Sequence, residues 1–346
     1  MNTEYIKLDF EKPLDGQLFG AAEVIKRGGL VVFPTETVYG LGASALDADA
    51  ARKIYAAKGR PSDNPLIIHI SSPEEAEKYC YVSPEYYRLA EKFLPGPLTV
   101  IMPKKDVVPK TVTGGLDTVA VRCPENEAAR ELIRLSGVPI AAPSANISGK
   151  PSPTSAAHVR EDLDGKVDVI IDGGECKIGL ESTIVKLDEG GATLLRPGAI
   201  TPQMLEKVLG KIKLDGGITK KNETDAPPLA PGMKYKHYAP RAQVYLLSGD
   251  ADKITAFLLG KLAENENIGV LCFDELTEKL SGKYIVPFGK KDDESAHAKR
   301  LFKALRYFDD VEVNEIYATS VGTDGIDLAT YNRMLKASGY TIIEVK

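Results

Sequence analysis

Residues 31–66 read VVFPTETVYGLGASALDADAARKIYAAKGRPSDNPL and contain signals for a strand, a turn and a helix in close succession. The apolar run ends at Pro34, a polar turn follows, and Gly40 to Gly42 let the backbone bend where a ligand could approach. Asp47 is placed to cap a helix that Gly59 ends. This order predicts a strand edge that opens onto a binding site.

Two cations, Lys58 and Arg60, leave the same corner as the polar turn. Taken alone they are more often structural, because Lys and Arg in a last helical turn complement the macrodipole. A binding role for this pair therefore depends on residues from elsewhere in the chain.

Composition indicates an ordinary soluble protein with room for two domains, since 346 residues are 43% hydrophobic and 27% charged. The 44 basic and 49 acidic residues give a net charge of −5. No global positive field attracts nucleic acid or anionic lipid, so any anion site must be local.

Four widely spaced cysteines without a C-x-x-C pair suggest neither a zinc site nor a disulfide framework. The N-terminal residues are charged, and no stretch approaches the ~20 apolar residues that span a bilayer. We therefore expect a cytoplasmic protein without a membrane segment.

Two further stretches predict a lined cavity in the N-terminal part. In the strand of residues 118–122, Val119 and Val121 share one face and Arg122 lies on the other with small residues. Ser144 and Asn146 follow a buried strand, where α/β proteins commonly place their sites.

The domain organisation follows from a change in composition. Residues 213–241 are rich in proline, and from residue 242 strands and helices alternate again. We predict an α/β domain at 1–212, a linker at 213–241 and a smaller parallel α/β domain at 242–346. The linker segment 231–240 interleaves cations with aromatics, so it is either a surface tether or a lid.

Several familiar motifs are absent, including the P-loop, the dinucleotide fingerprint, the hydrolase nucleophile elbow and the zincin helix. What remains is a set of cations and small hydroxyls at strand ends, which suits a polyanion beside a small zwitterion. Each residue alone also has a structural interpretation: His69 could be a core histidine, and Ser144 and Asn146 could hold a turn.

Four motifs in register carry a family resemblance: residues 33–41, Lys58-Gly59-Arg60 with residues 64–66, residues 143–146 and residues 181–183. They resemble the YrdC-like domain of threonylcarbamoyl-adenylate synthases, whose marker is K-x-R followed by S-x-N. Residues 230–238 and the second domain resemble the long, two-domain branch. The resemblance implies a twisted mixed-sheet α/β domain, a linker and a smaller Rossmann-like parallel domain.

The resemblance also implies a nucleotidyltransferase that converts L-threonine, bicarbonate or carbon dioxide, and ATP into threonylcarbamoyl-AMP and pyrophosphate. This is the first step of threonylcarbamoyladenosine formation beside the tRNA anticodon, and the product would pass to a tRNA-modifying transferase complex. Mg²⁺ is expected on the ATP phosphates rather than in a protein cage.

By the same resemblance, Lys58 and Arg60 are catalytic, and the linker's Tyr235 closes the pocket. The ATP-binding residues would be Lys58, Ser62, Thr118, Ser144, Asn146, Ser152, Arg196 and Tyr235. The L-threonine-binding residues would be Thr35, His69, Arg122, Ala142 and Ser182.

Two other functions stay open from the sequence: an RNA-binding module, and a transferase that uses carbamoyl phosphate. The isoelectric point of about 5.6 argues against strong RNA binding, so we expect direct tRNA binding to be weak or absent. The second domain has no catalytic constellation of its own, and it could position the linker, contact a partner or only add stability.

Overall fold

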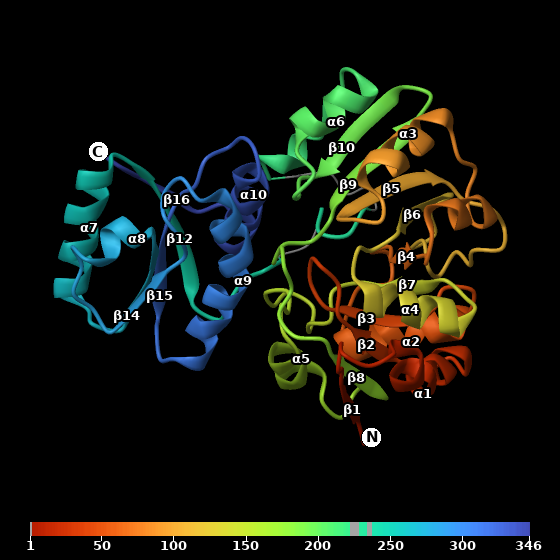
Figure 1. Cartoon of the computed structure of the whole chain (residues 1–346). Coiled ribbons are helices and arrows are strands. Elements are labelled where there is room, and N and C mark those ends of the chain that lie inside the picture. The colour runs from red at the N-terminus through yellow and green to blue at the C-terminus, as the bar shows by residue number, and fades with distance from the viewer. Residues whose placement is uncertain (1, 222–227, 234–236) are drawn as a thin grey trace.

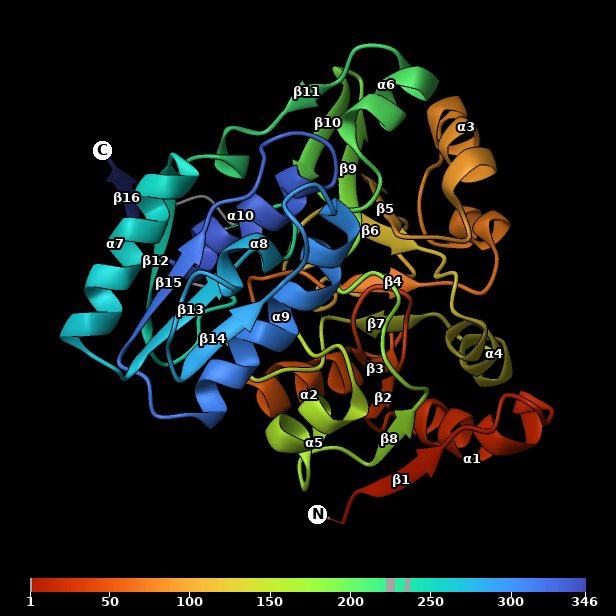
Figure 2. The ribbon, with the colours of Figure 1, turned by 60° about the vertical axis from the view of Figure 1, so that its left-hand side comes forward.

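The computed structural model describes residues 2–221, 228–233 and 237–346, which form two α/β units side by side (Figure 1). The N-terminal unit holds the strands β1 to β11 and the C-terminal unit the strands β12 to β16. Figure 2 shows the same two units after a turn about the vertical axis. The predicted α/β architecture of both halves is confirmed.

The N-terminal unit is built on an 11-stranded mixed sheet with the order β1-β8-β2-β3-β7-β4-β6-β5-β9-β10-β11. Its strands are β1 (Glu4–Lys7), β2 (Val31–Phe33), β3 (Gly40–Ser44), β4 (Ile67–His69), β5 (Leu98–Pro103), β6 (Thr118–Arg122), β7 (Ile140–Ala142), β8 (Val169–Asp172), β9 (Thr183–Asp188), β10 (Gly191–Arg196) and β11 (Lys213–Leu214). Its helices are α1 (Leu14–Lys26), α2 (Ala48–Lys58), η1 (Pro73–Lys78), α3 (Pro84–Phe93), α4 (Glu127–Ser136), α5 (Ala156–Leu163), α6 (Pro202–Leu209) and η2 (Gly216–Ile218).

Helices cover both faces of this sheet, because alternate strand residues point to opposite sides. One face packs on α1 and α4, as in the cluster of Leu18 with Leu132. The other face packs on α2, α3 and α5, as in the cluster of Ile54, Leu89 and Val159. The sheet is therefore buried on both sides, and its strand ends are where ligands can reach it.

Local signals place several elements where the sequence predicts them. The Asp47 side chain caps α2 by accepting from the amides of Asp49 and Ala50, and Gly59 ends that helix at φ 63°. Strands β9 and β10 pair as the expected antiparallel hairpin.

The prediction that Gly40 to Gly42 form a bend is wrong. These residues begin β3, which pairs antiparallel with β2. A Cβ on Gly42 would lie 2.6 Å from Ile140 Cγ2 and 2.7 Å from Phe33 Cε1, and one on Gly40 would lie 3.0 Å from Phe33 Cζ. The glycines make room for the Phe33 ring rather than for a turn.

The C-terminal unit has a five-stranded sheet with the order β14-β13-β15-β12-β16, and all its strand pairs are parallel as predicted. Its strands are β12 (Gln243–Gly249), β13 (Ile268–Cys272), β14 (Tyr284–Pro287), β15 (Glu315–Thr319) and β16 (Ile342–Val345). Its helices are α7 (Ala251–Glu264), α8 (Asp274–Thr277), α9 (Glu294–Asp310) and α10 (Asp327–Ala337).

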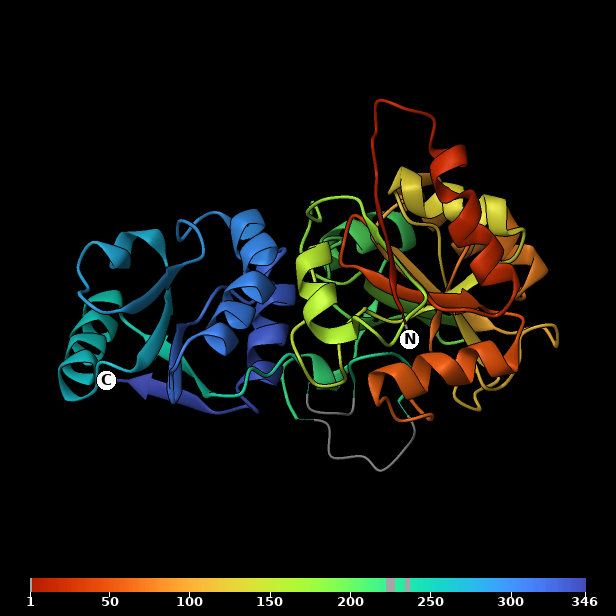
Figure 3. The same cartoon turned by 90° about the horizontal axis from the view of Figure 1, so that it is seen from below.

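Helices α9 and α10 lie on the side of this unit that faces the N-terminal unit, whereas α7 and α8 lie on the far side (Figures 1 and 3). Two helices of the second unit therefore pack toward the loops of the first. Within the described ranges, no helix combines the length and apolar character needed to cross a membrane.

Candidate functional site

A cavity lies in the N-terminal unit where several strand ends meet. Its volume of about 50 Å³ has room for only a few water molecules. We call it the chamber, and its lining residues are Thr35, Val38, Tyr39, Gly40, Arg60, Ile67, His69, Arg122, Ala142, Pro143, Ser144, Asn146, Ser152, Glu181, Ser182, Arg196, Pro231, Gly232, His237 and Tyr238. Most of them stand at or just beyond the ends of strands, as the sequence predicts.

Three buried guanidinium groups, those of Arg60, Arg122 and Arg196, line the chamber. Arg60 donates to the backbone oxygens of Asn64 at 3.1 Å and Pro65 at 2.9 Å. Because carbonyls carry no formal charge, these bonds orient Arg60 without neutralising it. Burial lowers the pKa of Arg60 and that of Arg196 to about 10, so both stay charged at neutral pH.

Arg196 connects three parts of the wall. Its Nε donates to the Ser182 backbone oxygen at 3.1 Å, its Nη2 to Ser182 Oγ at 3.2 Å, and its Nη1 to the Pro231 backbone oxygen at 3.3 Å. Ser182 Oγ also lies 2.7 Å from Thr99 Oγ1. The guanidinium is therefore held in place mainly by neutral groups, and its charge remains available to an anion.

Arg122 is the exception, because its Nη2 forms a buried ion pair of 2.7 Å with Glu36 Oε1. Glu36 Oε2 and Arg122 Nε have no partner among the described residues, so both retain hydrogen-bonding capacity. Glu36 was not among the residues predicted to bind a ligand. Its position directly after Thr35 in the most informative motif was the available signal.

Lys58 lies behind the chamber wall rather than in its lining. Its Nζ donates to the backbone oxygens of Ser144 and Asn146, both at 2.5 Å. Desolvation lowers the Lys58 pKa well below the usual lysine value, and Arg60 lowers it further. Lys58 is only 2% exposed, so it is not a solvated cation at a helix end. Its two hydrogen bonds instead hold the turn that carries the S-x-N residues.

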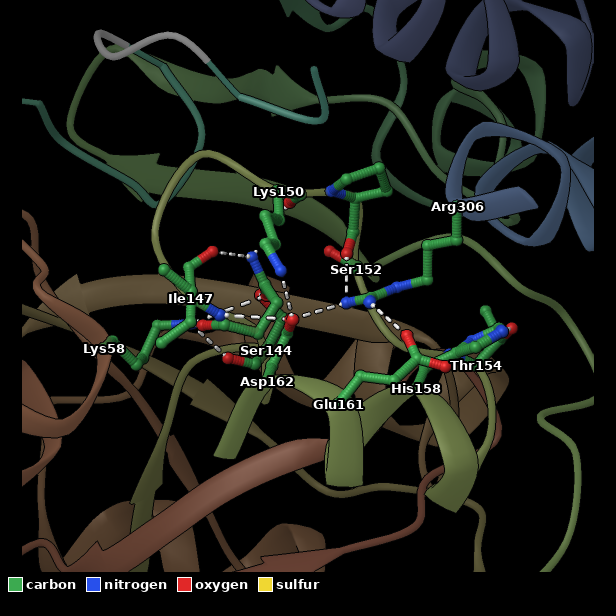
Figure 4. A network of polar contacts seen from close by, with 12 residues as sticks. Lys58, Ser144, Ile147, Lys150, Ser152, Thr154, His158, Glu161, Asp162 and Arg306 are labelled. Atoms are coloured by element: carbon green, nitrogen blue, oxygen red, sulfur yellow. Dashed lines mark hydrogen bonds and ion pairs between the residues drawn. The ribbon is translucent and has the colours of Figure 1, made fainter. Parts of the chain in front are cut away.

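Hydrogen bonds set the shape of the segment 144–152 (Figure 4). Ser144 Oγ donates to Asn146 Oδ1 at 2.5 Å, and Asn146 Nδ2 donates to the backbone oxygens of Ile147 and Lys150. Ser144 and Asn146 thus hold the turn, and both also line the chamber. A structural role does not remove these two residues from the candidate site.

Ser152 Oγ donates at 2.5 Å to Glu181 Oε1, and Glu181 Oε2 accepts from Arg333 Nε of α10 at 3.0 Å. Sequence reasoning missed Glu181 and Arg333 as site residues. Glu181 lies within a quoted motif, but nothing in the sequence distinguishes Arg333 from an arginine on a solvated helix face.

Two neutral histidines complete the lining. Burial lowers the pKa of His69 and that of His237 to about 3, and nearby arginines add to the effect. His69 Nδ1 lies 3.2 Å from the Ile67 backbone oxygen. His237 Nε2 is buried without a partner among the described residues. Neither imidazole is protonated near neutral pH.

All five residues predicted to bind threonine line the chamber. Of the residues predicted to bind ATP, Ser144, Asn146, Ser152 and Arg196 line it. Ser62 is exposed and Thr118 is half-buried, and neither contributes to the lining. Tyr235 lies outside the described residues.

No group of three or more His, Cys, Asp or Glu side chains that could hold a metal ion occurs in the described part of the chain. The chamber's Glu181 is paired with Arg333, and the neighbouring Glu36 is paired with Arg122. Besides the unpartnered Oε2 of Glu36, the oxygens available here belong to hydroxyl, amide and carbonyl groups.

Two family models together match almost the whole chain. The family described as "Telomere recombination" matches residues 23–198, and the family described as "Threonylcarbamoyl-AMP synthase, C-terminal domain" matches residues 200–339.

Individual relatives agree with this assignment. The threonylcarbamoyl-AMP synthase of Pyrococcus abyssi is 51% identical over 332 residues, which are 94% of this chain and 95% of that protein. The Bacillus subtilis enzyme of the same name is 45% identical over 95% of both chains. The crystal structure of P. abyssi Sua5 complexed with L-threonine matches all of both chains with a TM-score of 0.90 and 46% identity.

Proposed function

The chain belongs to the threonylcarbamoyl-AMP synthase family, and from this premise we propose that it converts L-threonine, bicarbonate or carbon dioxide, and ATP into threonylcarbamoyl-AMP and pyrophosphate. The observation that carries the proposal is the convergence of three buried arginines with small hydroxyls and amides in one chamber. Fixed cations of this kind stabilise phosphate charge without a protein nucleophile.

The proposed reaction has two steps. The neutral amine of threonine adds to carbon dioxide, so that a nitrogen–carbon bond forms, a proton leaves and a carbamate results. A carbamate oxygen then attacks the α-phosphorus of ATP, and the bond from that phosphorus to the bridging oxygen of the β-phosphate breaks. Pyrophosphate leaves with the bonding electrons.

Threonine would lie among Thr35, His69, Arg122, Ala142 and Ser182. Arg122 suits its carboxylate, since the guanidinium has an unpaired Nε, and the free Oε2 of Glu36 suits its amine or hydroxyl. His69, with a pKa of about 3, acts as a neutral hydrogen-bonding group rather than as a base. The arrangement favours a small zwitterion.

ATP would lie against Ser144, Asn146 and Ser152, with its phosphates toward Arg60 and Arg196. These two guanidinium groups offset the charge that gathers as carbamate and triphosphate approach each other. Lys58 would act from behind the wall, through the turn that it holds.

Mg²⁺ would enter with ATP as part of the substrate. The donor set fits this arrangement, because the chamber offers neutral oxygens and both nearby carboxylates are already paired with arginines. The ion would supply further neutralisation of the phosphate charge when bound. We propose no protein cage for it.

The product would pass to a tRNA-modifying transferase complex in the cytoplasm. A mixed anhydride of carbamate and phosphate is prone to hydrolysis, so transfer to a partner competes with water. The net charge of −5 gives no reason to expect strong direct binding of tRNA.

The test is pyrophosphate release from purified protein supplied with ATP, Mg²⁺, bicarbonate and L-threonine, with each component omitted in turn. We expect release to require all of them and the nucleotide product to contain the threonine carbon skeleton. Pyrophosphate release without threonine, or activity that needs carbamoyl phosphate instead of bicarbonate, would contradict the proposal.

A further inference from the structure

A carboxylate lines a chamber that is proposed to hold a triphosphate. Glu181 is 7% exposed, and its pKa stays lowered despite burial because Arg333 and then Arg196 attract its charge. It is therefore ionised at neutral pH. An uncompensated negative charge at this position would repel the phosphates.

The compensating charge comes from the second domain. Arg333 of α10 is fully buried and forms an ion pair with Glu181. The distance between Arg333 Nε and Glu181 Oε2 is 3.0 Å. Its Nη1 donates to the backbone oxygen of Pro197 at 2.8 Å and to Asn332 Oδ1 at 3.2 Å. The guanidinium also lies 5.8 Å from the centre of the Tyr238 ring. Its position is thus defined from both domains.

The other Glu181 oxygen orients the chamber wall, because Ser152 Oγ donates to it at 2.5 Å. After Arg333, the cation that acts most strongly on the Glu181 charge is Arg196, the group proposed to contact the phosphates. Without its ion pair, the Glu181 carboxylate would compete with ATP for Arg196, because a buried charge without a counter-charge is unfavourable.

A second pair of the same kind holds the segment that follows the S-x-N residues (Figure 4). Arg306 of α9 donates to Asp162 Oδ2 at 2.7 Å and to the Pro151 backbone oxygen at 2.8 Å. Asp162 in turn accepts from Lys150 Nζ at 2.8 Å and from the Ile147 amide at 3.3 Å. Glu181, which lines the chamber, and Asp162, which does not, are therefore both paired with arginines of the second domain.

We infer that Arg333 is a positioning residue that neutralises Glu181, and that the second domain thereby completes the electrostatic environment of the ATP site. This inference rests on the proposed function. It gives the C-terminal unit a definite part in nucleotide binding, which a purely stabilising domain would not have. Removal of Arg333 then weakens ATP binding through the charge of Glu181.

Equilibrium binding of MgATP in the absence of threonine tests the inference, measured by calorimetry on the full chain. We expect Arg333→Met to weaken binding roughly tenfold or more, because it exposes ATP to an unpaired carboxylate. The double variant Arg333→Met with Glu181→Gln should recover most of the affinity, since glutamine keeps an acceptor for Ser152 but carries no charge. Arg300→Met is the matched control, because Arg300 lies on α9 with a half-exposed side chain and contacts Asp274 of its own domain.

Thermal unfolding of each variant separates a loss of charge compensation from a loss of fold. Wild-type affinity in folded Arg333→Met would overturn the inference, and so would a double variant that binds no better than Arg333→Met. If Arg333→Met does not fold, MgATP binding to the single variant Glu181→Gln is the test. Binding at least as tight as that of the wild type supports the inference. Clearly weaker binding overturns it. A wild-type protein that binds no MgATP would overturn the proposed function itself, and the inference with it.

Discussion

The two sheets of this protein use their strand ends in opposite ways. In the N-terminal mixed sheet, small and charged residues at the strand ends form the chamber. In the C-terminal parallel sheet, the carboxyl edge is where α/β proteins usually bind ligands. There the His297–Asp327 pair, with Nδ1 and Oδ1 2.9 Å apart, packs against the rings of Phe273 and Phe288.

The difference shows that topology alone does not locate function. The second sheet contributes to the site through arginines on α9 and α10, which face the first domain, and not through its strand ends. Arg60 and Arg196 in the chamber donate mainly to backbone carbonyls, whereas Arg306 and Arg333 of the second domain are paired with carboxylates. Of these four arginines, the two without an ion pair in the described part of the chain line the chamber.

The largest effect should follow from the lysine behind the chamber wall. Lys58→Met should lower the rate of pyrophosphate release at least ~100-fold, because it removes the two hydrogen bonds that hold the Ser144 and Asn146 carbonyls and so displaces the turn that lines the chamber. Lys53→Met, on the exposed side of the same helix, is the control and should stay within about twofold of wild type. Full activity of a folded Lys58→Met protein would remove Lys58 from the proposed machinery.

The interdomain pair of Arg306 and Asp162 should stabilise the fold more than an exposed ion pair does. Arg306→Met leaves the buried Asp162 with Lys150 as its cation and the Ile147 amide as a further donor, so we expect the free energy of unfolding in urea to fall by about 3 kcal/mol. The exposed pair of Arg300 and Asp274 should contribute about 0.5 kcal/mol or less. Equal effects of Arg306→Met and Arg300→Met would mean that the interface charge is unimportant.

A smaller effect should come from the glycine that the strand β3 requires. Gly42→Ala places a Cβ within 2.7 Å of the Phe33 ring and Ile140, and should lower the free energy of unfolding by about 1–3 kcal/mol. Gly16→Ala in α1 is the control, because its Cβ would meet nothing within 4 Å. A neutral Gly42→Ala would show that the strand has room to shift.

The smallest effect should be the pH dependence of the buried pair in the second sheet. Asp327 raises the pKa of His297 above its ordinary value despite desolvation. The pair therefore stabilises the fold fully below the unfolded histidine pKa of about 6.5, and this contribution is lost as pH rises through the folded pKa. Unfolding in urea should show His297→Gln less stable than wild type by about 1 kcal/mol at pH 6, with a smaller difference at pH 8.5. A difference that grows with pH would contradict this assignment.

Local signals predicted most elements correctly. The Asp47 cap and Gly59 at positive φ bound α2 as expected, because a cap and a left-handed residue act within a few positions of the chain. The prediction of a bend at Gly40 to Gly42 was wrong. The sequence does not distinguish a glycine that permits a turn from one that leaves room for a neighbouring ring.

The sequence by itself determined the order of strands and helices, because caps and strand alternation depend on short separations, and its family resemblance supplied the residues predicted to bind threonine. Only the tertiary structure decided which charges remain free. The partners of Arg122 and Arg333 lie 86 and 152 residues away along the chain, and the charges that shift the pKa values of Lys58 and Glu181 include Arg306 and Arg333 of the second domain. Charge compensation over such separations arises from packing, which no local pattern specifies.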